Sequence, residues 1–357
     1  HRSLYIRYES NQNENGLGGM MQQVDIAGDD VVFPATNGWF LQVYNWNGVA
    51  NENAQDVRFP YRTYYRIIRN ANTILGAVDT TIGPDADKKV LKGQALLYRA
   101  FCHYQLVQLF GKRYVNGVDN SQLGVPLVLT VSNEGFARST VEQVYTQINK
   151  DLDEANTLLV GYTKPNNSHL GLSVAQGLKA RVALTQGNWA IAADYAAKAK
   201  TGITLMNAEE YVKGFNDYAG KEWMWGSHIN EVQTDYFGNF GAYMSRNYNS
   251  TVIRTCPKAI NSKLYNLIPT TDVRSKLFDK TGVHASLNLP STFTKYPYTS
   301  QKFLSISTGD SRCDVPYMRV AEMYLIEAEA KAKLGQADAA AVLFALVKTR
   351  DTGYTLS

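Results

Sequence analysis

Apolar residues recur at helical spacing along much of this chain, with polar residues between them. Over residues 61–78 the spacing predicts one helix, which "TTIGPDAD" ends before a second helix begins at Asp85. The second helix is apolar over a wide arc up to Gly111, and such a helix is buried among other helices. Thr140 and Gln143 have the spacing of a capping box and predict the start of a third helix.

Two stretches share one helical pattern although they lie far apart in the sequence. Residues 172–200 and 317–350 each read as a helix, a turn that contains a glycine, and a second helix rich in alanine. Gly187 and Gly335 occupy matching positions 148 residues apart. Tandem tetratricopeptide repeats recur about every 34 residues. We therefore expect repeat-like helix pairs separated by large insertions rather than a tandem array.

The stretch "YMRVAEMYLIEAEAKAKLGQ" predicts a packing helix. One face of that helix carries Ala321, Leu325, Ala328 and Ala332, whose spacing follows successive turns. Small side chains on this face would let a second helix approach closely. Arg319 and Glu322 can pair across one turn on the exposed side.

The carboxylates of the same helix are predicted to be structural. Glu322 and Glu329 share a face, but two turns separate them by about 10 Å along the axis. The paired carboxyls of glycosidases lie about 5 to 9.5 Å apart. We therefore interpret Glu322, Glu327 and Glu329 as part of a charged, solvated face and not as an acid–base pair.

The helical pattern weakens in two long segments. The first segment is rich in asparagine, glycine and aromatic residues, and we expect loops with short helical turns there. The second segment contains "KEWMWGSHINEVQTDYFGNFGAYMSRNYN". Because binding residues concentrate on irregular segments that a regular scaffold positions, we expect function to reside here.

Composition narrows the class of function. The net charge is +4 and no run of lysine or arginine exceeds a pair, so nucleic acid is not an expected partner. The 23 tyrosines are unusual, because each offers a flat apolar ring with a polar edge to a sugar, peptide or protein. No apolar run reaches the roughly 18 residues that would suggest a transmembrane helix.

No fingerprint of a catalytic, metal or cofactor site occurs. The three cysteines lack the spacing of a zinc site, and a bridge between Cys256 and Cys313 stays open as a possibility. Cys102 and His103 fall in the helix predicted to be buried and are interpreted as structural. "GLGG" at 16–19 lacks the lysine and the preceding strand of a phosphate-binding loop. We therefore expect no enzyme, no metal and no cofactor.

Several stretches, in order along the chain, resemble segments of the SusD/RagB family, the surface nutrient-binding lipoproteins of Bacteroidetes. The "LKGQALLYRAFCHYQLVQLFG" stretch resembles one family helix, with Gln94 where the family usually has glutamate, and Asp272 and Arg274 fit its Asp-x-Arg motif. Residues 112–123 lengthen one loop relative to the family pattern. The matching stretches are 64–75, 91–111, 138–159, 175–199 and 315–335.

The resemblance implies a mainly α-helical, SusD-like fold. In it, tetratricopeptide-like helix pairs form a scaffold and an irregular, loop-rich half binds the ligand. We expect residues 1–357 to form a single SusD-like domain, from which the family's N-terminal lipidation region and C-terminal section are absent. The expected scaffold is mainly 57–110, 138–200 and 315–350, and the expected binding portion is 1–56 and 203–314.

The resemblance also implies a function without catalysis. Family members bind oligosaccharides at the cell surface for import through a partner SusC-like TonB-dependent outer-membrane transporter, and an N-terminal lipid anchors them to the outer membrane. The alternative is a peptide- or protein-binding helical-repeat component of a RagB-like uptake complex, with contacts on the concave helical surface. Glycan binding without product release would separate these possibilities from each other and from an enzyme.

Aromatic residues in the irregular segments are the predicted ligand contacts. Trp46 is flanked by amide side chains, and aromatic faces stack on sugar rings while amides bond hydroxyls. The family's sugar contacts often come from the loop in which Trp46 lies. For Trp223 and Trp225, a core position is favoured for whichever ring points inward. The predicted ligand-binding set is Trp39, Asn45, Trp46, Tyr236, Phe237, Phe240 and Tyr243.

Overall fold

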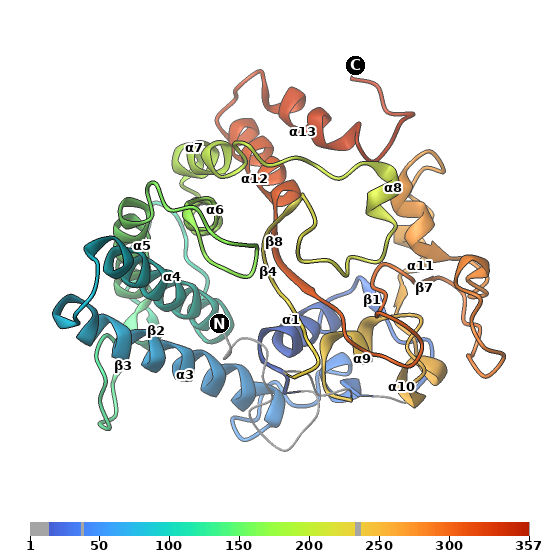
Figure 1. Ribbon diagram of the computed structural model, residues 1–357, viewed down its shortest axis with the longest axis horizontal. Coiled ribbons are helices and arrows are strands. Elements are labelled where there is room, and N and C mark those ends of the chain that lie inside the picture. Colours follow the sequence, from blue (N-terminus) through green and yellow to red (C-terminus); the bar gives the residue numbers. More distant parts are fainter. Residues whose placement is uncertain (1–13, 37–38, 233–236, 357) are drawn as a thin grey trace. The chain divides into compact units, whose positions relative to one another are not determined.

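The computed structural model describes residues 14–36, 39–232 and 237–356, and within them the chain is mainly helical (Figure 1), which confirms the predicted fold class. The α-helices are α1 (Gly16–Ile26), α2 (Leu41–Tyr44), α3 (Gln55–Ala77), α4 (Asp85–Phe110), α5 (Val141–Leu158), α6 (Leu172–Thr185), α7 (Trp189–Ala199), α8 (Ala208–Tyr211), α9 (Phe240–Met244), α10 (Thr251–Thr255), α11 (Ser262–Tyr265), α12 (Val320–Lys333) and α13 (Ala339–Val347). Short 3-10 helices are η2 (Val78–Thr80), η3 (Val273–Leu277) and η4 (Ala285–Leu287). The strands are β1 (Val31–Val32), β2 (Leu123–Pro126), β3 (Arg138–Thr140), β4 (Trp223–Ser227), β5 (Ala259–Ile260), β6 (Phe278–Asp279), β7 (Thr299–Ser300) and β8 (Val315–Arg319).

The chain divides into two compact units. The helical unit consists of residues 60–204 and 318–345, and the loop-rich unit of residues 1–59, 205–317 and 346–357. These ranges run close to the predicted scaffold and binding portions. That the two portions form a single domain stays a prediction.

A buried ion pair ties three helices of the helical unit together. Arg99 of α4 donates two hydrogen bonds of 2.8 Å to the carboxylate of Asp151 in α5, and a third of 3.1 Å to Asn72 in α3. All three side chains are buried, so each charge has a partner inside the unit. α4 also approaches α5 closely at Gly93, where a Cβ atom would lie only 2.9 Å from Leu159.

Helices are present at all four predicted positions, as α6, α7, α12 and α13. α6 packs on α7 as a pair, and the main partner of α12 is α7, with α6 beside it. Helices α6 and α12 end in the same way, with Gly187 and Gly335 in the left-handed region at φ +68°. In α6, the N–H groups of Gly187 and Asn188 donate to the carbonyls of Leu184 and Ala183. In α12, the N–H groups of Gly335 and Gln336 donate to the carbonyls of Ala332 and Lys331. This is the Schellman motif, which favours glycine because a Cβ atom is disfavoured there. The matching glycines therefore mark matching helix ends.

The packed face of α12 differs from the predicted face. Leu325 and Ala332 are exposed, whereas Ala321 and Ala328 are buried as predicted. The buried face also takes in Met323 and the carboxylate of Glu327. The prediction was wrong for Leu325 and Ala332. It treated charged residues as exposed, whereas the carboxylate of Glu327 is buried and paired within the helical unit.

The carboxylates of α12 make ion pairs to other elements. Glu327 lies 2.6 Å from Lys200 and 3.1 Å from Lys331, and Glu322 receives two hydrogen bonds from Arg181 of α6. The predicted pairing of Glu322 with Arg319 is replaced by this contact between helices. A structural role fits both carboxylates.

The loop-rich unit contains a small sheet and a strand pair. The sheet order is β1–β5–β7–β6, with antiparallel neighbours and Val31 opposite Ile260. All five residues of β4 are buried where it pairs with β8, including Trp223 and Trp225. Both tryptophans are therefore core residues, as the sequence favours for rings that point inward.

Helix α1 was not expected, since residues 1–55 were predicted to be loops with short helical turns. It has 11 residues and packs against α9, where Gly18 lies next to Phe240. The buried Gln22 amide also donates to the Phe240 carbonyl at 3.1 Å. Glycine disfavours an isolated helix, so tertiary packing rather than local propensity stabilises this one.

The cysteines and His103 are structural. Cys102, Cys256 and Cys313 are buried free thiols, so the possible bridge is not formed. Burial raises the pKa of Cys102 and Cys313, which keeps both thiols protonated. Burial and, to a smaller extent, the positive charge of nearby Arg99 lower the pKa of His103 to about 3. The neutral ring accepts a hydrogen bond at Nε2 from the Val128 N–H.

Candidate ligand-binding site

The segment between α1 and α3 carries an unusual helix end at Trp46. The Trp46 N–H bonds the Val43 carbonyl at 3.1 Å and the Asn47 N–H bonds the Gln42 carbonyl at 3.0 Å. These are the two bonds of a Schellman motif at the end of α2. Trp46 therefore occupies the left-handed position, with φ +57°, that glycine takes in α6 and α12.

A tryptophan at this position carries backbone strain. A residue with a Cβ atom costs about 1–2 kcal/mol in the left-handed region relative to the right-handed one. Strained residues cluster at binding sites, where the surrounding structure holds them in place for function. The backbone of Trp46 is thus a second and independent reason to examine this segment.

The strained backbone holds the Trp46 ring at the surface. The side chain is 60% exposed, and its Nε1 donates a hydrogen bond of 3.1 Å to the carbonyl of Ala27, the residue that caps α1. One edge of the ring is therefore fixed while much of its surface meets solvent. Asn45, the capping residue of α2, is exposed beside it.

Trp39 is the second exposed ring of the segment. It is 39% exposed and contacts Tyr243 edge to face, with ring centroids 6.2 Å apart. Tyr243 in turn contacts Phe40 at 5.3 Å. Phe40 and Tyr243 belong to the buried cluster that also contains Ile26 and Phe33. Trp39 therefore rests on the core and presents its remaining surface outward.

Phe240 and Tyr243 cannot form part of a surface platform as predicted. They are only 6% and 1% exposed, because α9 packs against α1 and the buried cluster. Phe237 is 63% exposed, as a ligand contact would need. Tyr236 lies outside the described residues. The structure thus leaves Trp39, Asn45, Trp46 and Phe237 as the predicted residues with exposed side chains.

A groove of about 710 Å³ lies beside Trp39 within the loop-rich unit. This volume is within the roughly 300–1,000 Å³ that is typical of small-molecule sites. Trp46 does not line the groove, although its neighbour Asn47 does. The lining residues are Trp39, Phe40, Leu41, Gln42, Asn47, Gly48, Asn51, Ala54, Gln55, Asp56 and Val252.

Amide side chains supply most of the polar groups of the groove. The Asn47 amide donates to Gln42 at 3.0 Å, and the Gln55 amide donates to Glu14 at 2.8 Å. The Asn51 side chain accepts from the Asn53 N–H at 2.9 Å. These bonds orient the amides, and each amide group can form more than one hydrogen bond. The groove therefore offers oriented donors and acceptors beside an aromatic ring.

Asp56 is the one carboxylate among the described residues that line the groove. It lies in the first turn of α3, and burial raises the pKa of its carboxyl above the ordinary 3.8. A single carboxylate is suited to accept hydroxyl hydrogen bonds.

Sequence reasoning missed Gln42, Asn51, Gln55 and Asp56. A signal existed in "NGVANENAQD", where amide and acidic residues crowd the approach to a helix next to two exposed tryptophans. Short polar side chains before a helix are also ordinary caps and turns, so composition could not distinguish the two roles. Only the folded structure shows that these four residues line the same groove.

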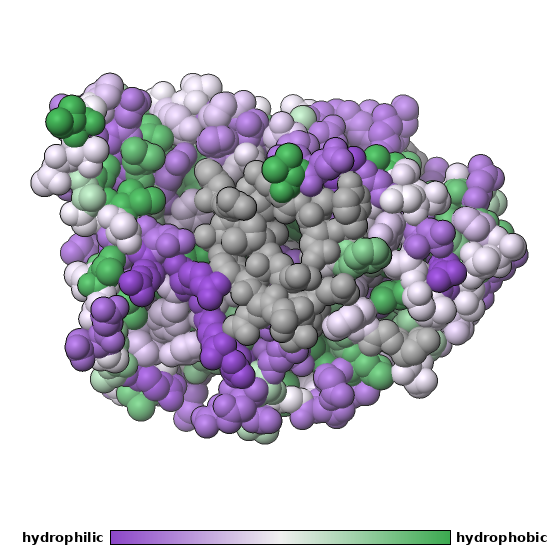
Figure 2. All heavy atoms as spheres, turned by 60° about the horizontal axis from the view of Figure 1, so that its bottom comes forward, coloured by the Kyte–Doolittle hydropathy of each residue, from purple (hydrophilic) through white to green (hydrophobic). Residues whose placement is uncertain are grey.

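The described surface is mixed in polarity on the face that Figure 2 shows. On the face drawn in Figure 2, hydrophobic residues of the described part stand singly or in small groups among hydrophilic ones. No helix in the described part of the chain is long and apolar enough to cross a membrane. Those same residues hold no cluster of three or more His, Cys, Asp or Glu side chains that could bind a metal ion.

Two family profiles match the chain. The SusD-like profile described as "Starch-binding associating with outer membrane" matches residues 10–184, and the SusD_RagB profile, described as "SusD family", matches residues 270–352. No curated protein matches the chain.

Solved structures share the fold over nearly the whole chain. A SusD-like carbohydrate binding protein from Bacteroides vulgatus is 26% identical, with a TM-score of 0.85, and the match covers 100% of this chain and 74% of that one. A putative sugar binding protein from the same organism is 25% identical, with a TM-score of 0.80 and coverage of 95% and 75%. A SusD superfamily protein from Bacteroides thetaiotaomicron, 22% identical with a TM-score of 0.78, covers 94% of this chain and 79% of its own and supports the fold alone.

Proposed function

The chain belongs to the SusD/RagB family, and on this basis we propose that it binds oligosaccharides without cleaving them, at the groove beside Trp39 and the exposed ring of Trp46. The observation that carries the proposal is the groove itself. It combines an exposed tryptophan, oriented amides and one carboxylate within residues 39–56.

This set of groups suits a sugar better than other ligands. The apolar face of a pyranose ring stacks on an indole, and its hydroxyls both donate and accept hydrogen bonds. The amides Gln42, Asn47 and Asn51 offer both functions, whereas an anion would require cationic groups that the lining residues do not contain. The matched structure titled as a SusD-like carbohydrate binding protein supports the same class of ligand.

The cellular role we propose follows the family. The protein would be held at the outer membrane by an N-terminal lipid and would deliver bound oligosaccharides to a SusC-like TonB-dependent transporter. The family description "associating with outer membrane" supports the location. We propose the transporter as a partner because the chain belongs to this family.

A direct binding screen tests the ligand class. The protein is titrated by calorimetry with defined maltose-, laminarin-, cellulose- and mannan-type hexasaccharides and with a mixture of tryptic peptides. We expect at least one hexasaccharide to bind and the peptides not to bind. Trp39→Ala should weaken binding by roughly tenfold or more, as for loss of one stacking contact.

Phe136→Ala is the matched control. Phe136 is as exposed as Trp39 but lies in the helical unit, outside the groove. Its removal should leave the affinity unchanged. Peptide binding without glycan binding would overturn the proposal in favour of a RagB-like peptide role. A Trp39→Ala variant with full affinity would move the site away from the groove.

A further inference from the structure

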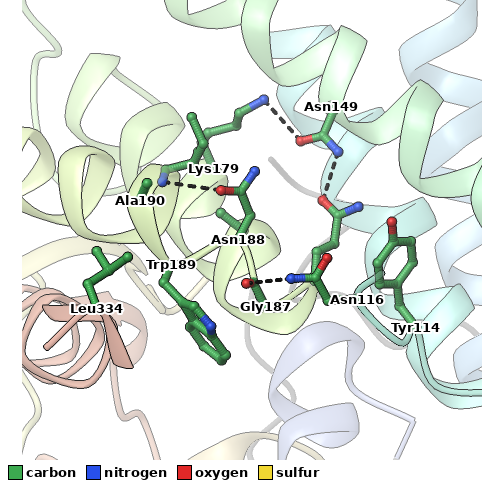
Figure 3. A pocket seen from close by; sticks show the side chains of 12 residues that line it. Tyr114, Asn116, Asn149, Lys179, Gly187, Asn188, Trp189, Ala190 and Leu334 are labelled. Carbon is green, nitrogen blue, oxygen red and sulfur yellow. Dashed lines mark hydrogen bonds between the residues drawn. The ribbon is translucent and has the colours of Figure 1, made fainter. Parts of the chain in front are cut away.

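A second pocket lies wholly within the helical unit, at the turn between α6 and α7. Its volume is about 620 Å³, again in the range of small-molecule sites. Figure 3 shows its side chains arriving from several segments of that unit. The lining residues are Tyr114, Asn116, Asn149, Lys179, Ala183, Gln186, Gly187, Asn188, Trp189, Ala190, Ile191 and Leu334.

The one cation of the lining is neutralised. Lys179 is buried, and its Nζ lies 2.7 Å from the carboxylate of Asp153 and donates to Asn149 at 2.9 Å. An anionic ligand would have to compete with Asp153 for this charge. The pocket therefore favours a neutral ligand.

Amide side chains supply most of the polar groups of the pocket. The Asn149 amide donates to Gln186 at 2.9 Å, and the Asn116 amide donates to the Gly187 carbonyl at 3.0 Å (Figure 3). The Asn188 oxygen caps α7 by accepting from the Ile191 N–H. Within the described part of the chain, these bonds leave the Asn116 Oδ1 as an acceptor and the Asn188 Nδ2 as a donor for a ligand.

Two aromatic rings complete the pocket. Tyr114 packs against Tyr145 with ring centroids 5.0 Å apart. Lys333 lies 5.8 Å from the centroid of the Trp189 ring. Both rings are half-buried, so their positions are held while part of each remains accessible.

We propose that this pocket is a second saccharide-binding site, which takes one neutral sugar unit between Tyr114 and Trp189 with Asn116 and Asn188 on its hydroxyls. A sugar hydroxyl donates and accepts at once, which matches the adjacent acceptor and donor. The inference rests on the proposed function for the class of ligand only. The site itself is separate in sequence and lies in the other unit.

Fluorine NMR can observe both sites in one sample. The chain has five tryptophans, which are labelled with 5-fluorotryptophan and assigned by single substitutions. The hexasaccharides used above are then titrated into the full chain and into its Trp39→Ala variant. We expect the Trp189 resonance to shift with at least one hexasaccharide in both proteins.

Two variants separate ligand contact from folding. Asn188→Ser keeps an N-cap oxygen for α7 but removes the amide donor, so it should fold normally and weaken the Trp189 response. Trp189→Leu should reduce sugar affinity measured in the Trp39→Ala background by roughly tenfold. Tyr324→Leu is the control, since Tyr324 also has a lysine over its ring but does not line the pocket.

The outcomes for the two sites are distinct. A Trp189 shift that Asn188→Ser weakens and Tyr324→Leu preserves supports the second site. A Trp189 resonance that stays fixed while Trp39 responds overturns it and leaves the proposed function intact. A Trp189 response that is unchanged in Asn188→Ser also overturns the assigned contacts. No response at any tryptophan overturns both proposals.

Discussion

At the scale of single residues, Trp46 combines a strained backbone with an exposed ring. Its left-handed backbone suits glycine, yet its ring is exposed and bonded to the Ala27 carbonyl. Natural proteins retain such strain where a side chain is needed for function. The position therefore allows stability and binding to be separated experimentally.

Replacing Trp46 with glycine should lower glycan affinity by roughly tenfold or more and leave stability equal or higher by up to about 1 kcal/mol. The reason is that glycine relieves the strain but removes the ring. Calorimetry and thermal unfolding measure the two effects. Trp46→Ala retains the strain, so it should lose affinity with little change in melting temperature. Unfolding of either variant with normal binding by the folded fraction would identify Trp46 as a core residue.

Asp56 should make glycan binding depend on pH. Burial raises the pKa of this carboxyl above the ordinary 3.8. On acidification it therefore becomes protonated at a higher pH than an ordinary aspartate does. The ionised form accepts hydroxyl hydrogen bonds more strongly, so affinity should be full above the raised pKa and fall below it. Titrations from neutral to acidic pH would show this fall.

The matched variant is Asp56→Asn, which should bind more weakly at neutral pH and lose the acid dependence. Because burial disfavours the ionised carboxylate, this variant should be no less stable than the parent at neutral pH. An acid-induced loss of affinity that persists in Asp56→Asn would assign the titration to another group.

At the scale of elements, the contacts of α12 can be tested by adding volume. Ala328 is buried on the packed face, so Ala328→Leu should overpack it and destabilise the protein by about 1–3 kcal/mol. Ala332, on the same helix, is exposed, and Ala332→Leu should change stability by no more than about 0.5 kcal/mol. Chemical denaturation measures both. Equal stability of the two variants would contradict the packing of this helix.

The ion pairs of α12 should affect stability without affecting binding. Glu327→Gln removes a buried charge from between Lys200 and Lys331 and is expected to cost about 1–3 kcal/mol. Glu329 is exposed, so Glu329→Gln serves as a near-neutral control. Both variants should bind glycan as the parent does. A loss of affinity in a fully folded Glu327→Gln protein would reverse the structural interpretation.

For the whole molecule, we expect binding without turnover. The groove lining contains one carboxylate within the described residues, and hydrolysis of a glycoside uses two. Prolonged incubation with each hexasaccharide that binds should produce no new reducing ends. Product that accumulates with the parent and disappears in Asp56→Asn would make the protein an enzyme.

Local sequence determined the features that a few neighbouring residues can encode. Thr140 and Gln143 form the predicted capping box of α5, and Gly187 and Gly335 end their helices in the left-handed region as their positions indicate. The predicted start of the first helix at residue 61 was wrong, since α3 begins at Gln55 and contains Pro60. Caps and turns depend on bonds within about five residues, so the sequence contains nearly all of their determinants.

Tertiary structure alone decided which side chains are buried and which meet at a site. Helix α1 packs against α9, and the same contact buries Phe240. Glu327 lies inside because Lys200 reaches it from the end of α7 and adds to the pairing with Lys331 of its own helix. The pocket between Tyr114 and Trp189 joins segments distant in sequence. Burial depends on the partner that covers a residue, and periodicity along one segment cannot identify a partner that arrives from another.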